Sequence, residues 1–111
     1  MDEDYIAKLA VAIAKKSPKD EVFAILEKIP NQNSSETIAY FLEKFYDRFE
    51  SEYKSAAKRD LNSVKNLCHN VSLKDVCENL MYLIYEREVK DILKTALISP
   101  SAIFIRREDK K

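Results

Sequence analysis

Apolar residues at the start of the chain recur at intervals of three and four, the spacing of one face of an α-helix. Between residues 3 and 16 this face consists of Tyr5, Ile6, Leu9, Ala10 and Ile13. The spacing predicts an amphipathic helix over residues 3–16.

A second helix is predicted to follow a capping sequence and to end at a proline. In Ser17-Pro18-Lys19-Asp20, Ser17 is expected to cap, Pro18 suits the first helical position, and Asp20 stands at the capping-box position. Pro30 disfavours helix in the residue before it. We therefore expect a short helix between Pro18 and Pro30, which packs Val22, Phe23, Ile25, Leu26 and Ile29.

The longest apolar stripe follows a polar loop at residues 30–35, in which Asn33 or Ser34 is expected to cap the next helix. A break is expected near Lys58–Asn62, because Asp60 would otherwise lie inside the stripe and can instead cap a shorter fourth helix. A single bent helix from 35 to 69 is the alternative. The stripe keeps helical spacing through Ile38, Phe41, Leu42, Phe45, Phe49, Tyr53 and Ala56, and the fourth helix would carry Leu61, Val64, Leu67 and Cys68.

The last predicted helix begins at a second capping sequence, Ser72 to Asp75, and extends to about Ile98. Its apolar residues change sides along its length. Either the helix breaks around Glu86–Glu88, or it continues and buries its second stripe against another copy or a partner protein. The first half carries Leu73, Val76, Cys77, Leu80, Leu83 and Ile84, and the opposite stripe carries Tyr85, Val89, Ile92, Leu93 and Ala96.

These elements predict an all-α fold, a compact single-domain bundle of about five helices with a long third helix and a bent or protruding last helix. The 111 residues suit one domain. Residues 1–98 are expected to form the bundle and 99–111 a short extended tail that is both basic and apolar. The tail either folds back on the bundle or binds a partner.

The chain contains no glycine. Phosphate-binding loops, dinucleotide-binding fingerprints and the usual nucleophile elbow all require glycine. We therefore expect no enzymatic activity and no cofactor, with the turns formed by Asn31, Asn70, prolines and helix caps.

The charge balance is neutral, with 19 basic and 19 acidic residues and a pI near 6.6. Nucleic-acid binding is disfavoured, since each phosphate contact needs a cation. No apolar run approaches the roughly 20 residues of a membrane span, and the acidic start Met1-Asp2-Glu3-Asp4 is unlike a signal peptide. We expect a cytoplasmic protein that does not enter a membrane.

Residues 18–48 have the layout of a helix-turn-helix, with a short helix, a turn of about four residues and a longer helix. A nucleic-acid-associated protein is accordingly the alternative function, although Glu36, Glu43, Asp47 and Glu50 on the second helix would repel phosphates. Its contacts would come from Ser34, Ser35, Thr37, Lys44, Arg106 and Arg107.

Three residues of types that bind zinc lie close together in the sequence: Cys68, His69 and Cys77. Their spacing lacks the paired Cys-x-x-Cys of a zinc site, so we expect no metal and predict that both cysteines are buried apolar residues. A disulfide across the predicted corner is geometrically possible.

The leading functional hypothesis is a non-catalytic helical accessory or adaptor protein that binds another protein or itself. A surplus of patterned apolar surface without accompanying catalytic residues favours this interpretation. The predicted contact residues are Tyr85, Val89, Ile92, Leu93, Ala96, Ile103, Phe104 and Ile105.

Overall fold

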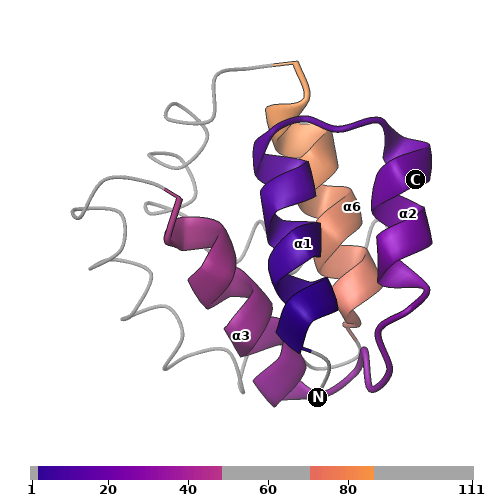
Figure 1. Cartoon of the computed structure of the whole chain (residues 1–111), viewed down its shortest axis with the longest axis vertical. Coiled ribbons are helices and arrows are strands. Elements are labelled where there is room, and N and C mark those ends of the chain that lie inside the picture. The colour runs from indigo at the N-terminus through magenta and orange to yellow at the C-terminus, as the bar shows by residue number, and fades with distance from the viewer. Residues whose placement is uncertain (1–2, 49–70, 87–111) are drawn as a thin grey trace.

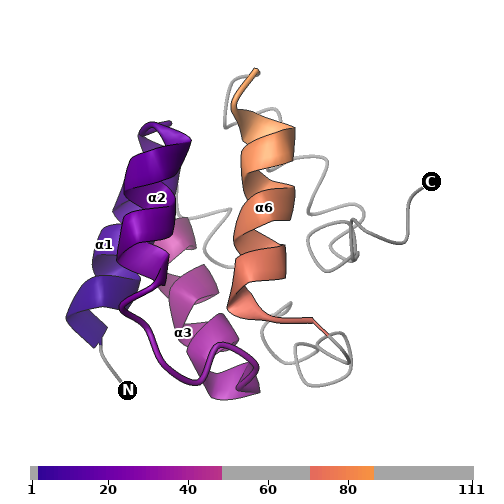
Figure 2. The same cartoon turned by 90° about the vertical axis from the view of Figure 1, so that its right-hand side faces the viewer.

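The computed structural model describes residues 3–48 and 71–86, which form four helices and no strand. The helices are α1 (Glu3–Ala14), α2 (Lys19–Leu26), α3 (Ser35–Tyr46) and α6 (Leu73–Ile84). α1 is central, packing against α2 and α3 and contacting α6. Figure 1 shows α3 and α2 on either side of α1, and Figure 2 shows α6 on the other side of the molecule from α1. The expected all-α class is confirmed.

The core forms where the apolar faces of the four helices meet. Phe41 and Phe45 are fully buried, and their stacked rings lie 6.2 Å apart between centroids. Phe45 also meets Tyr46 edge to face at 5.7 Å, so this aromatic row anchors α3. Each helix contributes predicted apolar residues to this core, including Ile6, Leu9, Ile13, Val22, Leu26, Ile38, Leu42, Leu73, Val76, Leu80 and Ile84.

α1 ends in a Schellman motif whose left-handed residue is Lys16, with φ 58°. The Lys16 N–H donates to the Ile13 carbonyl at 3.0 Å, and the Ser17 N–H donates to the Ala12 carbonyl at 2.9 Å. Because Ser17 closes α1, it does not cap α2. The predicted Ser17 cap is wrong: Pro18 is the N-cap residue, without a side-chain hydrogen bond.

The connection from α2 to α3 is longer than the predicted turn of about four residues. α2 ends at Leu26. Two hydrogen bonds of the 3₁₀ type follow it, from the Lys28 N–H to the Ile25 carbonyl and from the Ile29 N–H to the Leu26 carbonyl. Residues 27–34 therefore separate the helices.

The N-terminus of α3 follows the sequence prediction, but its length does not. Ser34 is the N-cap residue. The helix ends at Tyr46, where the Arg48 N–H turns back to the Phe45 carbonyl at 3.2 Å. The predicted third helix therefore does not run without interruption through Ala56, because apolar spacing identifies the buried face without fixing where the backbone turns. The alternative of a bent helix to residue 69 lies mostly outside the described residues. Phe49, Tyr53 and the expected fourth helix lie outside the described residues.

α6 begins with the predicted capping box. The Asp75 N–H donates to the Ser72 hydroxyl at 3.2 Å, and the Ser72 N–H donates to the Asp75 carboxylate at 2.9 Å. The helix ends at Ile84, and residues 85 and 86 form a turn. The helix predicted to extend to about Ile98 is therefore interrupted after Ile84. The rest of the second apolar stripe, from Val89 onward, lies outside the described residues.

Candidate functional site

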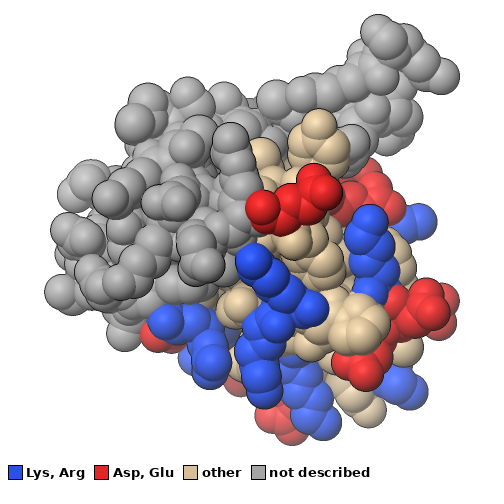
Figure 3. Space-filling model, turned by 90° about the horizontal axis from the view of Figure 1, so that it is seen from above, with Lys and Arg blue, Asp and Glu red and all other residues tan. Residues whose placement is uncertain are grey.

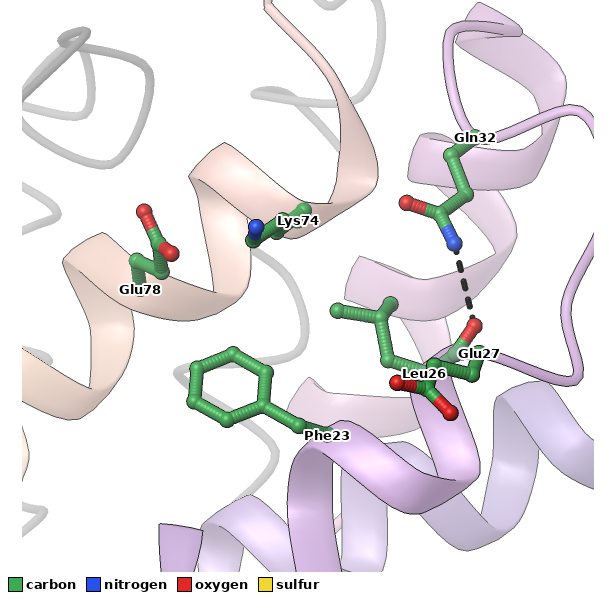
Figure 4. Close-up of a pocket in the computed structure, with 6 residues that line it drawn as sticks. All are labelled: Phe23, Leu26, Glu27, Gln32, Lys74 and Glu78. Carbon is green, nitrogen blue, oxygen red and sulfur yellow. Dashed lines mark hydrogen bonds between the residues drawn. The ribbon is translucent and has the colours of Figure 1, made fainter. Parts of the chain in front are cut away.

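A cleft of about 300 Å³ lies between α2 and α6 (Figure 4). This volume is at the lower end of the range for small-molecule sites and suits one or two large side chains. Its six lining residues are Phe23, Leu26 and Glu27 from α2 and the residue after it, Gln32 from the connecting loop, and Lys74 and Glu78 from α6.

Helical spacing places two of these residues on each wall. Phe23 and Glu27 are four residues apart on the α2 side, and Lys74 and Glu78 are four apart on α6, so each pair shares one face. The Phe23 ring projects toward α6 (Figure 4), and Leu26 beside it is 3% exposed. The cleft therefore has an apolar floor, while Glu27, Lys74 and Glu78 form a charged rim.

Gln32 closes one end of the cleft and joins the two helices. Its side-chain Nε2 donates to the carbonyl oxygens of Leu26 at 3.0 Å and Ile29 at 3.2 Å. The backbone carbonyl oxygen of Gln32 accepts the N–H of Leu73 at 2.6 Å. One residue thus satisfies carbonyls at the end of α2 and an amide in the first turn of α6, groups that a helix leaves unpaired.

Tyr85 joins the opposite ends of the same helices. Its hydroxyl donates to the carbonyl oxygen of Ser17 at 2.6 Å. Ser17 precedes α2 and Tyr85 follows α6, so the two helices run antiparallel, as Figure 2 shows. Burial raises the pKa of the Tyr85 phenol, and Cys77 adds to this shift.

The predicted protein-binding residues are only partly within the described chain. Tyr85 is half-buried, and its hydroxyl is already bonded within the fold. Val89, Ile92, Leu93 and Ala96 lie outside the described residues, as do Ile103, Phe104 and Ile105. Their contact with a partner stays a prediction.

The residues predicted to contact nucleic acid, where the structure describes them, make contacts within their own helix or are buried. The Ser34 hydroxyl accepts the N–H groups of Glu36 and Thr37 at 3.2 and 3.4 Å, and Thr37 is only 3% exposed. Ser35 is half-buried, and the Lys44 ammonium lies 5.1 Å from the centroid of the Tyr40 ring. Arg106 and Arg107 lie outside the described residues.

The helix pair itself also differs from the DNA-binding motif. The connection over residues 27–34 exceeds the turn of 3–4 residues that joins the helices of a helix-turn-helix. Of the charged side chains in residues 3–48 and 71–86, eleven are acidic and eight are basic. Both signs occur on the face seen in Figure 3, an arrangement that does not favour phosphate binding.

Cys77 is a buried, free thiol. Burial raises its pKa well above the ordinary value, and the Glu78 carboxylate contributes in the same direction. The prediction of a buried apolar cysteine is confirmed for Cys77, whereas Cys68 and His69 lie outside the described residues. In the described ranges, no cluster of three or more histidine, cysteine or acidic side chains is placed to hold a metal ion.

A second hollow, of about 360 Å³, lies on the outer face of α1. Small apolar residues, Ala7, Val11 and Ala12, line it between Lys8 and Lys15. Its lining comes from α1 and Ser17, so it lacks the facing walls that define the cleft between α2 and α6.

Sequence reasoning placed Phe23 and Leu26 on the apolar face of α2 but missed the role of Gln32. A glutamine after a helix-ending proline carries no recognised capping signal, since its bonds depend on how the loop folds back. Glu27, Lys74 and Glu78 line the same cleft although they are far apart in the sequence. Hydrophobic periodicity cannot reveal such a tertiary arrangement.

Comparison of the chain with protein-family models, curated proteins and solved structures gave no significant match. Among the residues the structure describes, no helix has the length and apolar character needed to cross a membrane.

Proposed function

We propose that this chain is a non-catalytic helical adaptor that binds another protein, with the cleft between α2 and α6 as a contact site. The observation that carries the proposal is a cleft with an apolar floor and a charged rim, formed between two helices that are hydrogen-bonded to each other's flanking residues at both ends. The predicted stripe at residues 85–107 is a second contact region on the same hypothesis.

The size of the cleft favours a protein ligand. Interface energy concentrates where a few large side chains enter well-packed pockets, and about 300 Å³ fits such an anchor. Phe23 and Leu26 offer the apolar contact, while the surrounding charges resemble the polar rim of a protein interface.

The hydrogen bonds that join the ends of the α2 and α6 segments also favour binding. Gln32 bonds to α2 and α6 at one end, and Tyr85 bonds to Ser17 at the other. A cleft held open in this way loses little conformational freedom when it is filled, which increases affinity.

Site-specific photo-crosslinking tests the proposal in cells that express the full chain. Benzoylphenylalanine is introduced at Lys74 to sample the cleft, and at Ile92 and Phe104 to sample the predicted stripe and tail. Glu43, an exposed residue of α3, is the matched control position. We expect discrete protein adducts from Lys74 and from at least one position in the stripe or tail, but not from Glu43.

The self-association form of the hypothesis has its own measurement. Light scattering should report an oligomer of the full chain that Leu93→Asp or Val89→Asp dissociates, if the partner is another copy. A monomer together with an absence of adducts at Lys74, Ile92 and Phe104 would overturn the adaptor function.

A further inference from the structure

We infer that the cleft between α2 and α6 receives a basic amphipathic segment of a partner protein, in which one large apolar side chain is flanked by lysine or arginine. This inference rests on the proposed adaptor function and specifies the chemistry of its partner.

The apolar part of the recognition comes from α2. The Phe23 ring is half-buried and projects toward α6, and Leu26 lies beside it, almost fully buried (Figure 4). A partner side chain that enters the cleft covers the remaining exposed part of the Phe23 ring. A leucine, methionine or phenylalanine has the size to do so in about 300 Å³.

The charge of the rim selects the flanking residues. Glu27 and Glu78 place a carboxylate on each wall, and Lys74 supplies the one ammonium among the lining residues. A cationic segment therefore meets two carboxylates and one ammonium at contact, which is a favourable balance of charge.

A segment of the opposite charge would meet the reverse arrangement. Its carboxylates would lie beside Glu27 and Glu78, with Lys74 as the one lining cation. Like charges brought together at an interface disfavour a wrong partner. The rim thus discriminates against acidic ligands as well as attracting basic ones.

The test titrates the full chain with a fluorescent alanine-based peptide of about twelve residues, the length at which such helices become populated. The peptide carries one phenylalanine, with lysines three and four positions away on the same face. A second peptide replaces the lysines with glutamates, and a third replaces the phenylalanine with alanine. We expect saturable binding of the first peptide at roughly 50 mM salt, with clear weakening for the other two.

Two charge-reversal variants distinguish the effect of the charges at the cleft rim from the effect of the net charge of the protein. Lys74→Glu makes all three charged lining residues acidic and places a carboxylate in the first turn of α6, where the helix dipole favours it, so folding should be retained. Lys8→Glu changes the total charge equally at an exposed position of α1 away from the cleft. Lys74→Glu should tighten the lysine peptide about two- to fivefold, whereas Lys8→Glu should change it less than about 1.5-fold.

The outcomes distinguish this inference from the proposed function. Absence of lysine-peptide binding, equal binding of the glutamate peptide, or equal tightening by the two charge reversals would overturn the basic-segment inference. If adducts still form at Lys74 in that case, the adaptor function stands with a partner of other chemistry. If the peptide binds as expected but no cellular adduct forms, the cleft has the inferred selectivity and the adaptor function falls.

Discussion

The hydroxyl of Tyr85 donates a 2.6 Å hydrogen bond to the carbonyl oxygen of Ser17, across 68 positions of sequence. A second bond of the same length joins the Leu73 N–H to the Gln32 carbonyl at the other end of α6. α6 is therefore attached by both ends to the two loops that border α2. These attachments set the separation of α2 and α6, and with it the width of the cleft.

Replacing Tyr85 with phenylalanine should lower the free energy of unfolding by about 1–2 kcal/mol, because the Ser17 carbonyl loses its partner. Urea unfolding of the full chain measures the change. Tyr40→Phe is the control, since it keeps the ring beneath the Lys44 ammonium. Equal destabilisation by the two substitutions would contradict a specific role for the Tyr85 hydroxyl.

Stability should decrease at alkaline pH. Burial raises the pKa of the Cys77 thiol well above its ordinary range and also raises that of Tyr85. Above the unfolded-state thiol pKa of about 8.5, the unfolded chain releases protons that the native chain retains, so the unfolding free energy decreases as pH rises.

Tyr85 should add to this decrease above about pH 10. Urea unfolding at a series of pH values measures both effects. Cys77→Ala removes the thiol and should flatten the profile between about pH 8.5 and 10. An unchanged slope in that variant would exclude the thiol as the cause.

Gln32→Glu should destabilise the protein by about 1–3 kcal/mol. The change replaces an amide donor, which now bonds to the carbonyls of Leu26 and Ile29, with a carboxylate that they repel. Asn33→Asp is the matched control, because it adds the same charge at an exposed position just before α3, where the helix dipole favours it. Thermal unfolding should separate the two variants, and a similar loss in both would indicate a general charge effect.

Lys16→Gly should stabilise the protein by roughly 0.5–1 kcal/mol. Lys16 has φ 58°, a conformation that strains a residue with a Cβ and costs glycine little, although the flexible unfolded chain offsets part of the gain. Lys15→Gly, in the preceding turn residue, is the control and should not stabilise. Chemical unfolding of both variants provides the comparison, and an equal response would argue against strain at Lys16.

Ser34→Ala should cost about 1 kcal/mol, because the Ser34 hydroxyl accepts the first free amides of α3. Ser35→Ala, one residue later and inside the helix, should change stability by less than about 0.5 kcal/mol, since alanine favours helix. Circular dichroism during thermal unfolding can compare the pair. A larger loss of stability for Ser35→Ala than for Ser34→Ala would indicate that Ser35, not Ser34, caps the helix.

The sequence by itself determined the all-α class, the apolar faces of α1, α2, α3 and α6, and the cap at Ser72, and it limited the cap of α3 to Asn33 or Ser34. These features are local: a helical face repeats every three or four residues, and a cap needs only the next three amides. The capping box predicted at Ser17 did not form, and the Ser17 N–H that Asp20 would accept in it donates instead to the Ala12 carbonyl at the end of α1.

Only the tertiary structure decided where α3 and α6 end and which residues form the cleft. The bond from Tyr85 to Ser17 and the position of Lys74 opposite Phe23 join segments far apart along the chain. Hydrophobic periodicity records which face is buried, but not which element covers it or where a loop folds back to satisfy a helix end. The helix ends and the lining of the cleft depend on tertiary packing and on hydrogen bonds of backbone groups, and every residue type has the same backbone carbonyl.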